Sequence, residues 1–312
     1  MIEVANLTKA YGERVAVDNI SFKVQKGEIL GLLGQNGAGK STTMKIITGF
    51  MSATSGTASV AGFDVFESPM EVKKRIGYLP ETPPLYEEML VWEYLDFAAS
   101  LRGLSGADRK TKIDRAVERC QLGDVRKRLI GNLSKGYRQR VGIAQAIVHE
   151  PEVLILDEPT IGLDPKQVSE ARSLIKSFSE DKTLIYSTHI LTEVAATCDR
   201  IIVIDQGKLV AQESLKGENA LGGLVKTEIV VQKNGETLVE TLSGIKGVKT
   251  VRYLANGSHR LVVESDHSDE LFAEMSKAVV DNGAGLIRMS PVQLALEEYY
   301  LDLIKGGKRS LS

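Results

Sequence analysis

GQNGAGKST, residues 34–42, contains three glycines, a lysine and two hydroxyl side chains. Its spacing fits G-x-x-x-x-G-K-[ST], the phosphate-binding loop that joins a strand to a helix. The flanking sequences agree, because GEILGLL before it predicts a buried strand and KSTTMKIITGF after it predicts a helix. Glycines lack a Cβ and let backbone N–H groups turn toward an anion, and the following helix adds its positive N-terminal end. The stretch therefore predicts a nucleoside triphosphate site.

Each residue type in this loop has an expected contact. Lys40 would reach the β- and γ-phosphates, and the Ser41 hydroxyl would ligate Mg²⁺. The residues expected to bind the nucleotide here are Gly34, Gln35, Asn36, Gly37, Ala38, Gly39, Lys40, Ser41 and Thr42.

Composition allows one large domain or two. The chain has 312 residues, 43% of them hydrophobic, and 39 basic against 41 acidic residues give a formal charge of −2. No long basic tract stands out, so nucleic acid is not an expected partner. Cys120 and Cys198 both fall in amphipathic helical stretches. We expect them to be small buried hydrophobes rather than metal ligands or a disulfide, as in a reducing compartment.

The N-terminal sequence MIEVANLTKAYGERV lacks the basic-then-apolar build of a signal peptide. No run of about 18 apolar residues, the length needed to cross a bilayer, occurs in the sequence. We therefore expect a cytosolic chain, unless another protein holds it at a membrane.

Short apolar runs that alternate with helical patterns predict an α/β fold. IEVANL, VAVDNISFKV and GEILGLL alternate in strand fashion and predict an antiparallel flap before the phosphate loop. EVLILDEP, KTLIYSTH and DRIIVIDQGK are separated by helical segments, which favours a parallel sheet covered by helices. A helical insertion is expected at about residues 85–150. The apolar stripe of its first helix consists of Val91, Tyr94, Leu95, Ala98 and Leu101.

The pattern changes after about Glu218. KTEIVVQ, VKTVRYL, RLVVES and GLIRMS predict strands, SDELFAEMSKAVVDNG predicts a helix, and an amphipathic helix is expected from Pro291 to Ile304. We therefore expect a nucleotide-binding domain at residues 1–217 and a small α+β accessory domain at residues 218–312.

VLILDEPT, residues 153–160, is an apolar strand that ends in two carboxylates. Neighbouring side chains on a strand point to opposite sides, so Asp157 and Glu158 cannot do the same work. We expect Asp157 to hold Mg²⁺ and Glu158 to polarise the water that attacks the γ-phosphate. His189, at the end of the next strand, would contact the γ-phosphate or orient that water. Taken alone, a histidine in this place is more often structural.

Seven motifs follow one another along the chain: Tyr11, GQNGAGKST, IGYLPE, LSKGY, LILDEP, GLDP and STH. On these motifs, residues 1–217 resemble the ATP-binding cassette (ABC) ATPases. The resemblance implies ATP as the nucleotide, with Tyr11 stacked on adenine. It also implies that Ser134 and Gly136 of the LSKGY signature contact the γ-phosphate bound to an opposite subunit, and that Leu163 and Asp164 cross the dimer seam. For Ser134, helix capping is the structural alternative.

Two motifs depart from the commonest family pattern. Glu81 stands where a glutamine usually follows the GYLP strand, and we expect it to act at the catalytic centre by meeting Mg²⁺ through water. Lys135 and Tyr137 stand in the signature, where Leu-Ser-Gly-Gly-Gln is usual. Lys135 either offsets charge near the seam or is a solvated side chain, and Tyr137 would lie along the ribose.

The resemblance implies an ATP-binding and ATP-hydrolysing subunit of an ABC transporter. The span IGYLPETPPLYEEMLVWEYLDFAASLRGL and the C-terminal domain resemble exporter ATPases of the gliding-motility, drug-resistance and sodium-extrusion types. Such a chain would form a homodimer through ATP, power a separately encoded membrane permease, and lie peripherally at the cytoplasmic face of the membrane. An importer subunit and a soluble ABC ATPase without a membrane partner remain alternatives.

Aromatic residues crowd after the strand that ends near Glu81: Tyr78, Tyr86, Trp92, Tyr94 and Phe97. Trp92 falls off the apolar stripe of its helix. In the resembling family this region receives a short cytoplasmic helix of the transmembrane subunit, so we expect Trp92 to be an interface anchor. The alternative is that Trp92 packs inside the helical insertion.

Overall fold

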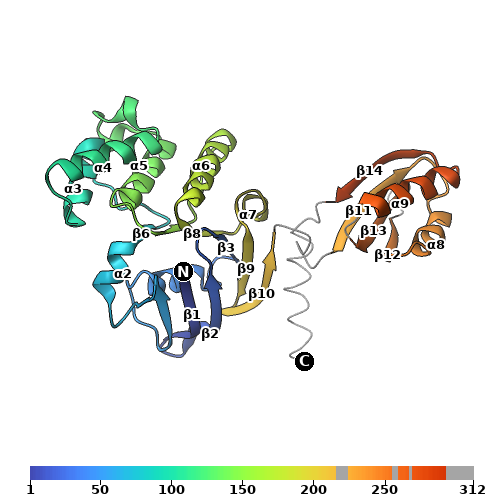
Figure 1. The fold of residues 1–312 in the computed structure, drawn as a ribbon, viewed down its shortest axis with the longest axis horizontal. Helices are drawn as coiled ribbons and strands as arrows, with labels where there is room; N and C mark the ends of the chain where they lie inside the picture. Colours follow the sequence, from blue (N-terminus) through green and yellow to red (C-terminus); the bar gives the residue numbers. More distant parts are fainter. Residues whose placement is uncertain (216–223, 255–258, 267–268, 293–312) are drawn as a thin grey trace. The chain divides into compact units, whose positions relative to one another are not determined.

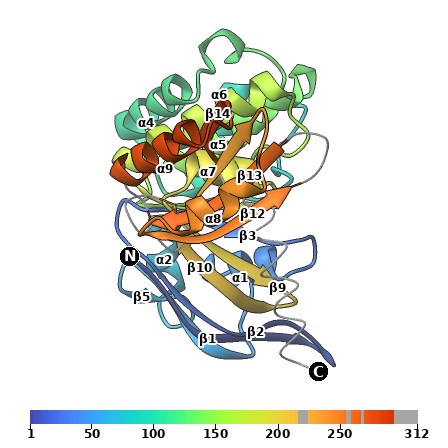
Figure 2. The ribbon, with the colours of Figure 1, turned by 90° about the vertical axis from the view of Figure 1, so that its right-hand side faces the viewer.

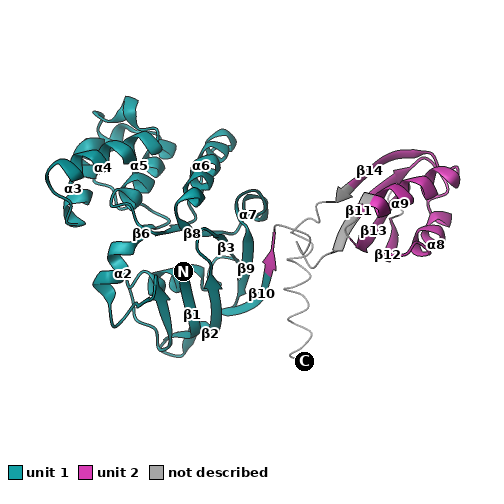
Figure 3. Cartoon of the chain, in the orientation of Figure 1, with its two compact units in different colours: residues 1–212 teal, residues 213–312 magenta. Residues whose placement is uncertain are grey.

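The computed structural model describes residues 1–215, 224–254, 259–266 and 269–292. The chain divides into two compact units, Met1–Gln212 and Glu213–Ser312 (Figure 3). Each unit has its own hydrophobic core. Within the described ranges, no helix combines the length and the apolar character that crossing a bilayer requires.

The chain up to β10 contains the predicted strands of the flap, a run of helices, and then strands separated by helices. Its elements are β1 (Ile2–Tyr11), β2 (Arg14–Val24), β3 (Ile29–Leu33), α1 (Lys40–Ile47), β4 (Ser55–Val60), β5 (Phe63–Asp64), α2 (Pro69–Arg75), β6 (Ile76–Leu79), α3 (Val91–Leu101), α4 (Gly106–Arg119), the 3-10 turns η1 (Gly123–Val125) and η2 (Ile130–Asn132), α5 (Lys135–Ile147), β7 (Val153–Asp157), α6 (Pro165–Ser177), η3 (Phe178–Glu180), β8 (Thr183–Thr188), α7 (Leu191–Thr197), β9 (Arg200–Asp205) and β10 (Lys208–Ser214).

A six-stranded sheet in the order β10-β9-β3-β8-β7-β6 forms the centre of the first unit (Figure 1). β3 pairs in parallel with β8 and β9, and β7 pairs in parallel with β6 and β8. Every residue of β3, β7 and β8 is buried, as is typical of parallel strands covered on both faces. The predicted parallel sheet is confirmed. Because the carboxyl ends of parallel strands meet at one edge, the segments after β3, β7 and β8 come together there.

A second, antiparallel sheet has the order β2-β1-β4-β5. Figure 2 shows β1 and β2 running beside each other as a long ribbon. Met44, Ile46 and Ile47 of α1 are fully buried in a core that also contains residues of both sheets. The predicted flap is confirmed, and this core fixes the helix that follows the phosphate loop.

The predicted helical insertion consists of α3, α4 and α5, which pack against one another (Figure 1). The apolar stripe of α3 is correct for Val91, Tyr94 and Leu95, which are buried, but wrong for Leu101, which is 72% exposed. Leu101 is the last residue of α3. The chain turns away after it, so no neighbouring element covers its side chain. Ala99 is buried instead.

The second unit is a small α+β domain, as expected. Its described elements are β11 (Leu224–Val231), α8 (Thr237–Ser243), β12 (Val248–Leu254), β13 (His259–Asp266), α9 (Asp269–Asp281) and β14 (Leu286–Val292). The strands pair antiparallel in the order β12-β13-β11-β14, and the core of the unit joins the sheet to α8 and α9. The sequence does not predict α8.

One boundary in this unit differs from the prediction. Pro291 does not begin a helix but lies in β14, opposite Thr227 of β11. β14 is an edge strand of the sheet, where a residue without a backbone N–H is tolerated. The remainder of the helix expected from Pro291 to Ile304 lies outside the described residues.

Candidate nucleotide-binding site

The loop between β3 and α1 borders an open cavity of about 410 Å³. Most of the residues predicted to bind nucleotide meet there, together with Glu81 and Glu158, which the sequence predicts to be catalytic. The lining residues are Tyr11, Arg14, Ala16, Gln35, Asn36, Gly37, Gly39, Lys40, Ser41, Thr42, Glu81 and Glu158. Gly34 and Ala38 belong to the loop but do not line the cavity.

Two glycines are required by the path of the loop. Gly39 has φ 112°, and a Cβ on it would lie 2.6 Å from the carbonyl oxygen of Ala16. A Cβ on Gly34 would lie 2.3 Å from the carbonyl oxygen of Ile204. The loop therefore passes against β2 and β9 at distances that only glycine permits, and α1 begins immediately after it.

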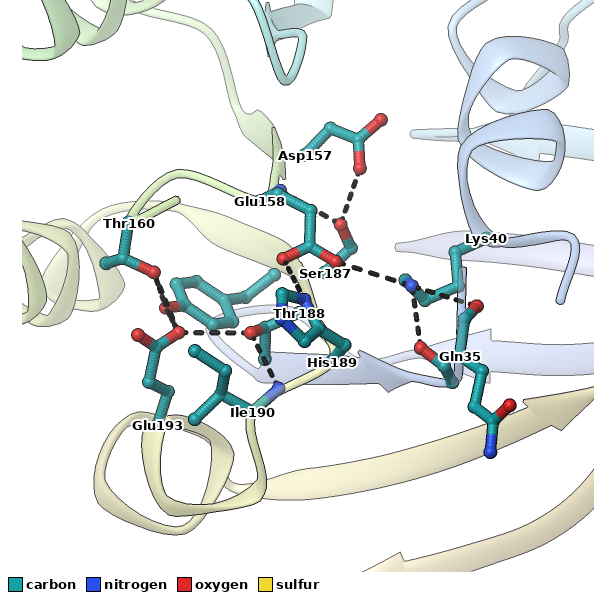
Figure 4. Close-up of polar contacts among 12 residues, drawn as sticks. Gln35, Lys40, Asp157, Glu158, Thr160, Ser187, Thr188, His189, Ile190 and Glu193 are labelled. Carbon is teal, nitrogen blue, oxygen red and sulfur yellow. Dashed lines mark hydrogen bonds and ion pairs between the residues drawn. The ribbon is translucent and has the colours of Figure 1, made fainter. Parts of the chain in front are cut away.

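Lys40 places a fixed positive charge at this cavity. Its side chain is buried, and Nζ donates to the carbonyl oxygens of Gly34 at 2.7 Å and Gln35 at 3.4 Å (Figure 4). Nζ also lies 3.3 Å from Oε1 of Glu158, and this ion pair is almost completely shielded from water. The ammonium is thus oriented by the same loop that would hold a phosphate chain.

The two carboxylates after β7 have different surroundings. Ser187 on β8 donates from Oγ to Oδ1 of Asp157 at 2.7 Å, and its Oγ accepts from the backbone N–H of Glu158 at 3.1 Å. Glu158 has φ 48°, a left-handed conformation that costs a non-glycine residue on the order of 1–3 kcal/mol. This conformation turns the Glu158 side chain toward Lys40, away from the side on which Asp157 meets Ser187 (Figure 4). Strain at this position is typical of a functional site.

His189 joins the same group. Its Nδ1 lies 2.9 Å from Oε2 of Glu158, so the tautomer with a proton on Nδ1 donates to that carboxylate (Figure 4). The imidazole is 42% exposed. Lys40, Glu158 and His189 therefore form one contiguous set, although His189 does not line the cavity itself.

Tyr11 lies at the rim of the cavity with 48% of its surface exposed, as a base-stacking ring requires. Lys9 places its Nζ 5.3 Å from the ring centroid. Across the hairpin, Tyr11 pairs with Arg14, which lines the cavity as well. Arg14 and Ala16 are residues that sequence reasoning missed. Arg14 is predictable from the β1–β2 hairpin, because a tight turn after Tyr11 pairs it with Tyr11 across the two strands.

The signature residues Ser134 and Gly136 lie away from the phosphate loop of this chain. Ser134 and Gly136 line a separate cavity of about 100 Å³ together with Leu163, and it shares no residue with the cavity of the phosphate loop. Ser134 caps α5, since its Oγ accepts from the backbone N–H of Tyr137 at 3.4 Å. Asp164 caps α6 by accepting from the backbone N–H of Gln167 at 2.9 Å. One chain therefore does not bring these residues to its own phosphate loop.

Comparison with known proteins identifies the family. Residues 17–161 match a family model described as ABC transporter. The bacitracin transport ATP-binding protein BcrA of Bacillus licheniformis is 34% identical over 312 residues, which cover 98% of each chain. The chain belongs to the ABC transporter ATP-binding proteins. Another full-length relative of this ABC ATPase is the linearmycin resistance ATP-binding protein LnrL of Bacillus subtilis (strain 168), 32% identical over 97% of this chain and 98% of LnrL.

Solved structures agree with this assignment. The dimeric structure of MJ0796, a bacterial ABC transporter cassette, superposes on this ABC ATPase with a TM-score of 0.64 and 26% identity, over 70% of this chain and 100% of that one. A dimeric post-hydrolysis structure of MJ0796 bound to ADP and Pi gives a TM-score of 0.64 at 25% identity. The expected ATP-binding and ATP-hydrolysing subunit of an ABC transporter is confirmed.

Proposed function

We propose that two copies of this chain bind two ATP molecules between them and hydrolyse them to drive a separately encoded membrane permease that exports its cargo. The observation that carries the proposal is the meeting of Lys40, Glu158 and His189 beside the phosphate loop. The dimeric state of the MJ0796 cassette supports the dimer. One full-length relative is named for resistance, which favours export over uptake. The permease would hold the chain peripherally at the cytoplasmic face of the membrane.

Hydrolysis requires a base for water and positive charge for the phosphates. In the proposal, a Glu158 oxygen takes a proton from water while the water oxygen bonds to the γ-phosphorus. The bond from the γ-phosphorus to the β–γ bridging oxygen breaks, which gives ADP and phosphate. Lys40 offsets the charge on the β- and γ-phosphates, and the Nδ1 proton of His189 fixes the Glu158 carboxylate.

The oxygen ligands near the loop suit Mg²⁺. In the part of the chain that the structure describes, no group of three or more His, Cys, Asp or Glu side chains could hold a metal unaided. Mg²⁺ commonly binds through one or two carboxylates, water and substrate phosphates. Ser41, Asp157 and, through water, Glu81 are the groups that would hold it. When bound, Mg²⁺ would neutralise charge on the β- and γ-phosphates.

The second copy would supply the residues that this chain keeps apart from its own phosphate loop. Ser134 and Gly136 would contact the γ-phosphate on the opposite copy, with the loop of Leu163 and Asp164 at the seam. Their separate cavity supports this arrangement, because signature residues that served their own chain would line the phosphate cavity.

The permease would dock on the aromatic surface of the helical insertion. Trp92 is 41% exposed, and Tyr86 and Phe97 also reach the surface, whereas Tyr94 is buried. Tyr86 stacks edge-on against Phe97 with ring centroids 5.8 Å apart, so these two rings are already ordered. Exposed aromatic side chains with few rotatable bonds are favourable anchors for a partner.

The test is the variant Glu158→Gln, which keeps the size of the side chain and removes its basicity. ATP turnover should fall by about 10²–10⁴-fold, the usual contribution of a positioned general base. Binding of a fluorescent ATP analogue should remain close to wild type. Turnover at the wild-type rate would remove Glu158 from the proposed role.

A further inference from the structure

A second buried carboxylate lies next to the proposed catalytic group. Glu193 on α7 is 4% exposed. Its Oε2 accepts from the Thr160 hydroxyl at 2.7 Å, the Tyr186 hydroxyl at 2.8 Å and the Thr188 hydroxyl at 3.0 Å (Figure 4). All three donors are neutral hydroxyls. Burying a carboxylate is unfavourable unless it is well hydrogen-bonded, so this oxygen holds its three partners firmly.

One of these partners, Thr188, adjoins His189. Thr188 directly precedes His189, and its Oγ1 also accepts from the backbone N–H of Ile190 at 3.1 Å. The residues on both sides of His189 are therefore attached to Glu193, one directly and one through Thr188. His189 in turn meets Glu158 at 2.9 Å.

A second partner of Glu193, Thr160, lies in the loop that follows β7. Thr160 lies two residues after Glu158, and its carbonyl oxygen accepts from the backbone N–H of Leu163 at 3.2 Å. The backbone N–H of Ile161 donates to the carbonyl oxygen of Glu158 at 3.1 Å. Thr160 thus begins a short hydrogen-bonded turn that leads to Leu163 and Asp164.

We propose that Glu193 is a positioning residue for ATP hydrolysis, which fixes His189 against Glu158 and ties both to the loop of Thr160. The inference rests on the proposed function, since it assumes that Glu158 and His189 act on ATP. The turn from Thr160 to Asp164 leads to the proposed dimer seam. If this turn moves, the Glu193 carboxylate, which is hydrogen-bonded to both Thr160 and Thr188, would transmit the movement to the backbone around His189. Glu193 does not touch ATP itself.

The test compares Glu193→Gln with wild type in the full-length chain. The glutamine keeps the shape but offers the three hydroxyls a neutral and weaker acceptor. We expect kcat for ATP hydrolysis to fall by about 10–100-fold, as misplacement of catalytic groups commonly causes, while the Kd of a fluorescent ATP analogue changes by less than about twofold. The matched control is Thr197→Val on the same helix, because Thr197 is equally buried and its hydroxyl has no hydrogen-bond partner. This control should keep the wild-type kcat.

A second measurement separates positioning from general support of the fold. If Glu193 acts through His189, adding Glu193→Gln to His189→Ala should lower kcat by less than about twofold beyond the single His189→Ala variant. If the fall in kcat of the double variant equals the product of the falls in the two single variants, the inference is wrong. Should Glu193→Gln fail to fold, Thr188→Val removes the hydroxyl beside His189 alone, and an unchanged kcat in that variant would also overturn it.

The proposed function and this inference can fail separately. If Glu158→Gln abolishes turnover while Glu193→Gln turns over ATP like wild type, the inference is wrong and the proposed function stands. If Glu158→Gln itself turns over ATP normally, the proposed function is wrong, and the inference fails with it.

Discussion

Lys40 and Glu158 form an ion pair inside the protein, and breaking it by Lys40→Met should destabilise the nucleotide-free chain. The charges are 3.3 Å apart, and their side chains are only 6% and 7% exposed. At an effective dielectric constant of about 20, two unit charges at this distance attract by about 5 kcal/mol before desolvation is counted. Removing one partner of a buried pair typically costs about 3–5 kcal/mol, because the other charge stays buried. Since Glu158 keeps its bond to His189, we expect a loss of about 3 kcal/mol.

Trp92 gives a convenient assay, because it is the only tryptophan and lies in the first unit. Urea unfolding followed by its fluorescence, without nucleotide, therefore reports the first unit alone. The double variant Lys40→Met/Glu158→Gln should recover to within about 1 kcal/mol of wild type, because it leaves no unpaired buried charge.

A matched control uses a pair that is closer but exposed. Lys23 and Glu3 lie 2.9 Å apart with side chains 67% and 57% exposed, so Lys23→Met should leave the urea midpoint unchanged. A Lys40→Met variant as stable as wild type, or a double variant as unstable as Lys40→Met alone, would show that the ion pair does not stabilise the chain.

Two further predictions concern the first unit. Burial, with a contribution from the positive charge of Arg102, lowers the pKa of His149 from 6.5 to about 4, and its buried Nδ1 has no partner to accept an added proton. As the pH falls, His149 therefore takes up a proton in the unfolded chain before it does so in the folded chain, and the stability present above pH 6.5 is lost as the pH falls toward 4. From pH 7 to 5, the free energy of unfolding should fall by about 2 kcal/mol in wild type. This loss should be absent in His149→Gln, and urea unfolding measures both. Trp92→Ala should leave the ATPase activity of the isolated chain unchanged. In a pull-down titration it should make the free energy of permease binding less favourable by on the order of 2 kcal/mol or more. Phe50→Ala is the control, because Phe50 is another exposed aromatic residue (74%). Unchanged permease binding, or unfolding of the Trp92→Ala chain, would instead place Trp92 in the packing of the helical insertion.

The sequence predicts best where local geometry allows one solution. The spacing of Gly34, Gly39 and Lys40 predicts the phosphate loop because only glycine fits there, as the contacts with Ala16 and Ile204 confirm. Fully apolar runs such as VLILD predict the parallel strands for a similar reason, since both faces must be covered.

The misses arise where tertiary context decides. SGTASV, which forms β4, is too small and polar to predict a strand and depends on pairing with β1. Leu101 fits a helical stripe, but the end of α3 leaves nothing to cover it. Glu193 resembles an ordinary solvated helix residue in sequence. Only the fold brings Thr160, from a distant segment, together with Tyr186 and Thr188 of the preceding strand around its carboxylate.

A mixing experiment tests whether a second copy of the chain completes the catalytic site. Lys40→Ala disables the phosphate loop, and Ser134→Arg disables the signature loop. Each variant alone should hydrolyse ATP only at background. Mixed dimers carry one site in which an intact Lys40 faces an intact Ser134, so an equal mixture should recover up to about a quarter of wild-type turnover. If the mixture gives only the sum of the two separate activities, one copy does not complete the catalytic site of the other.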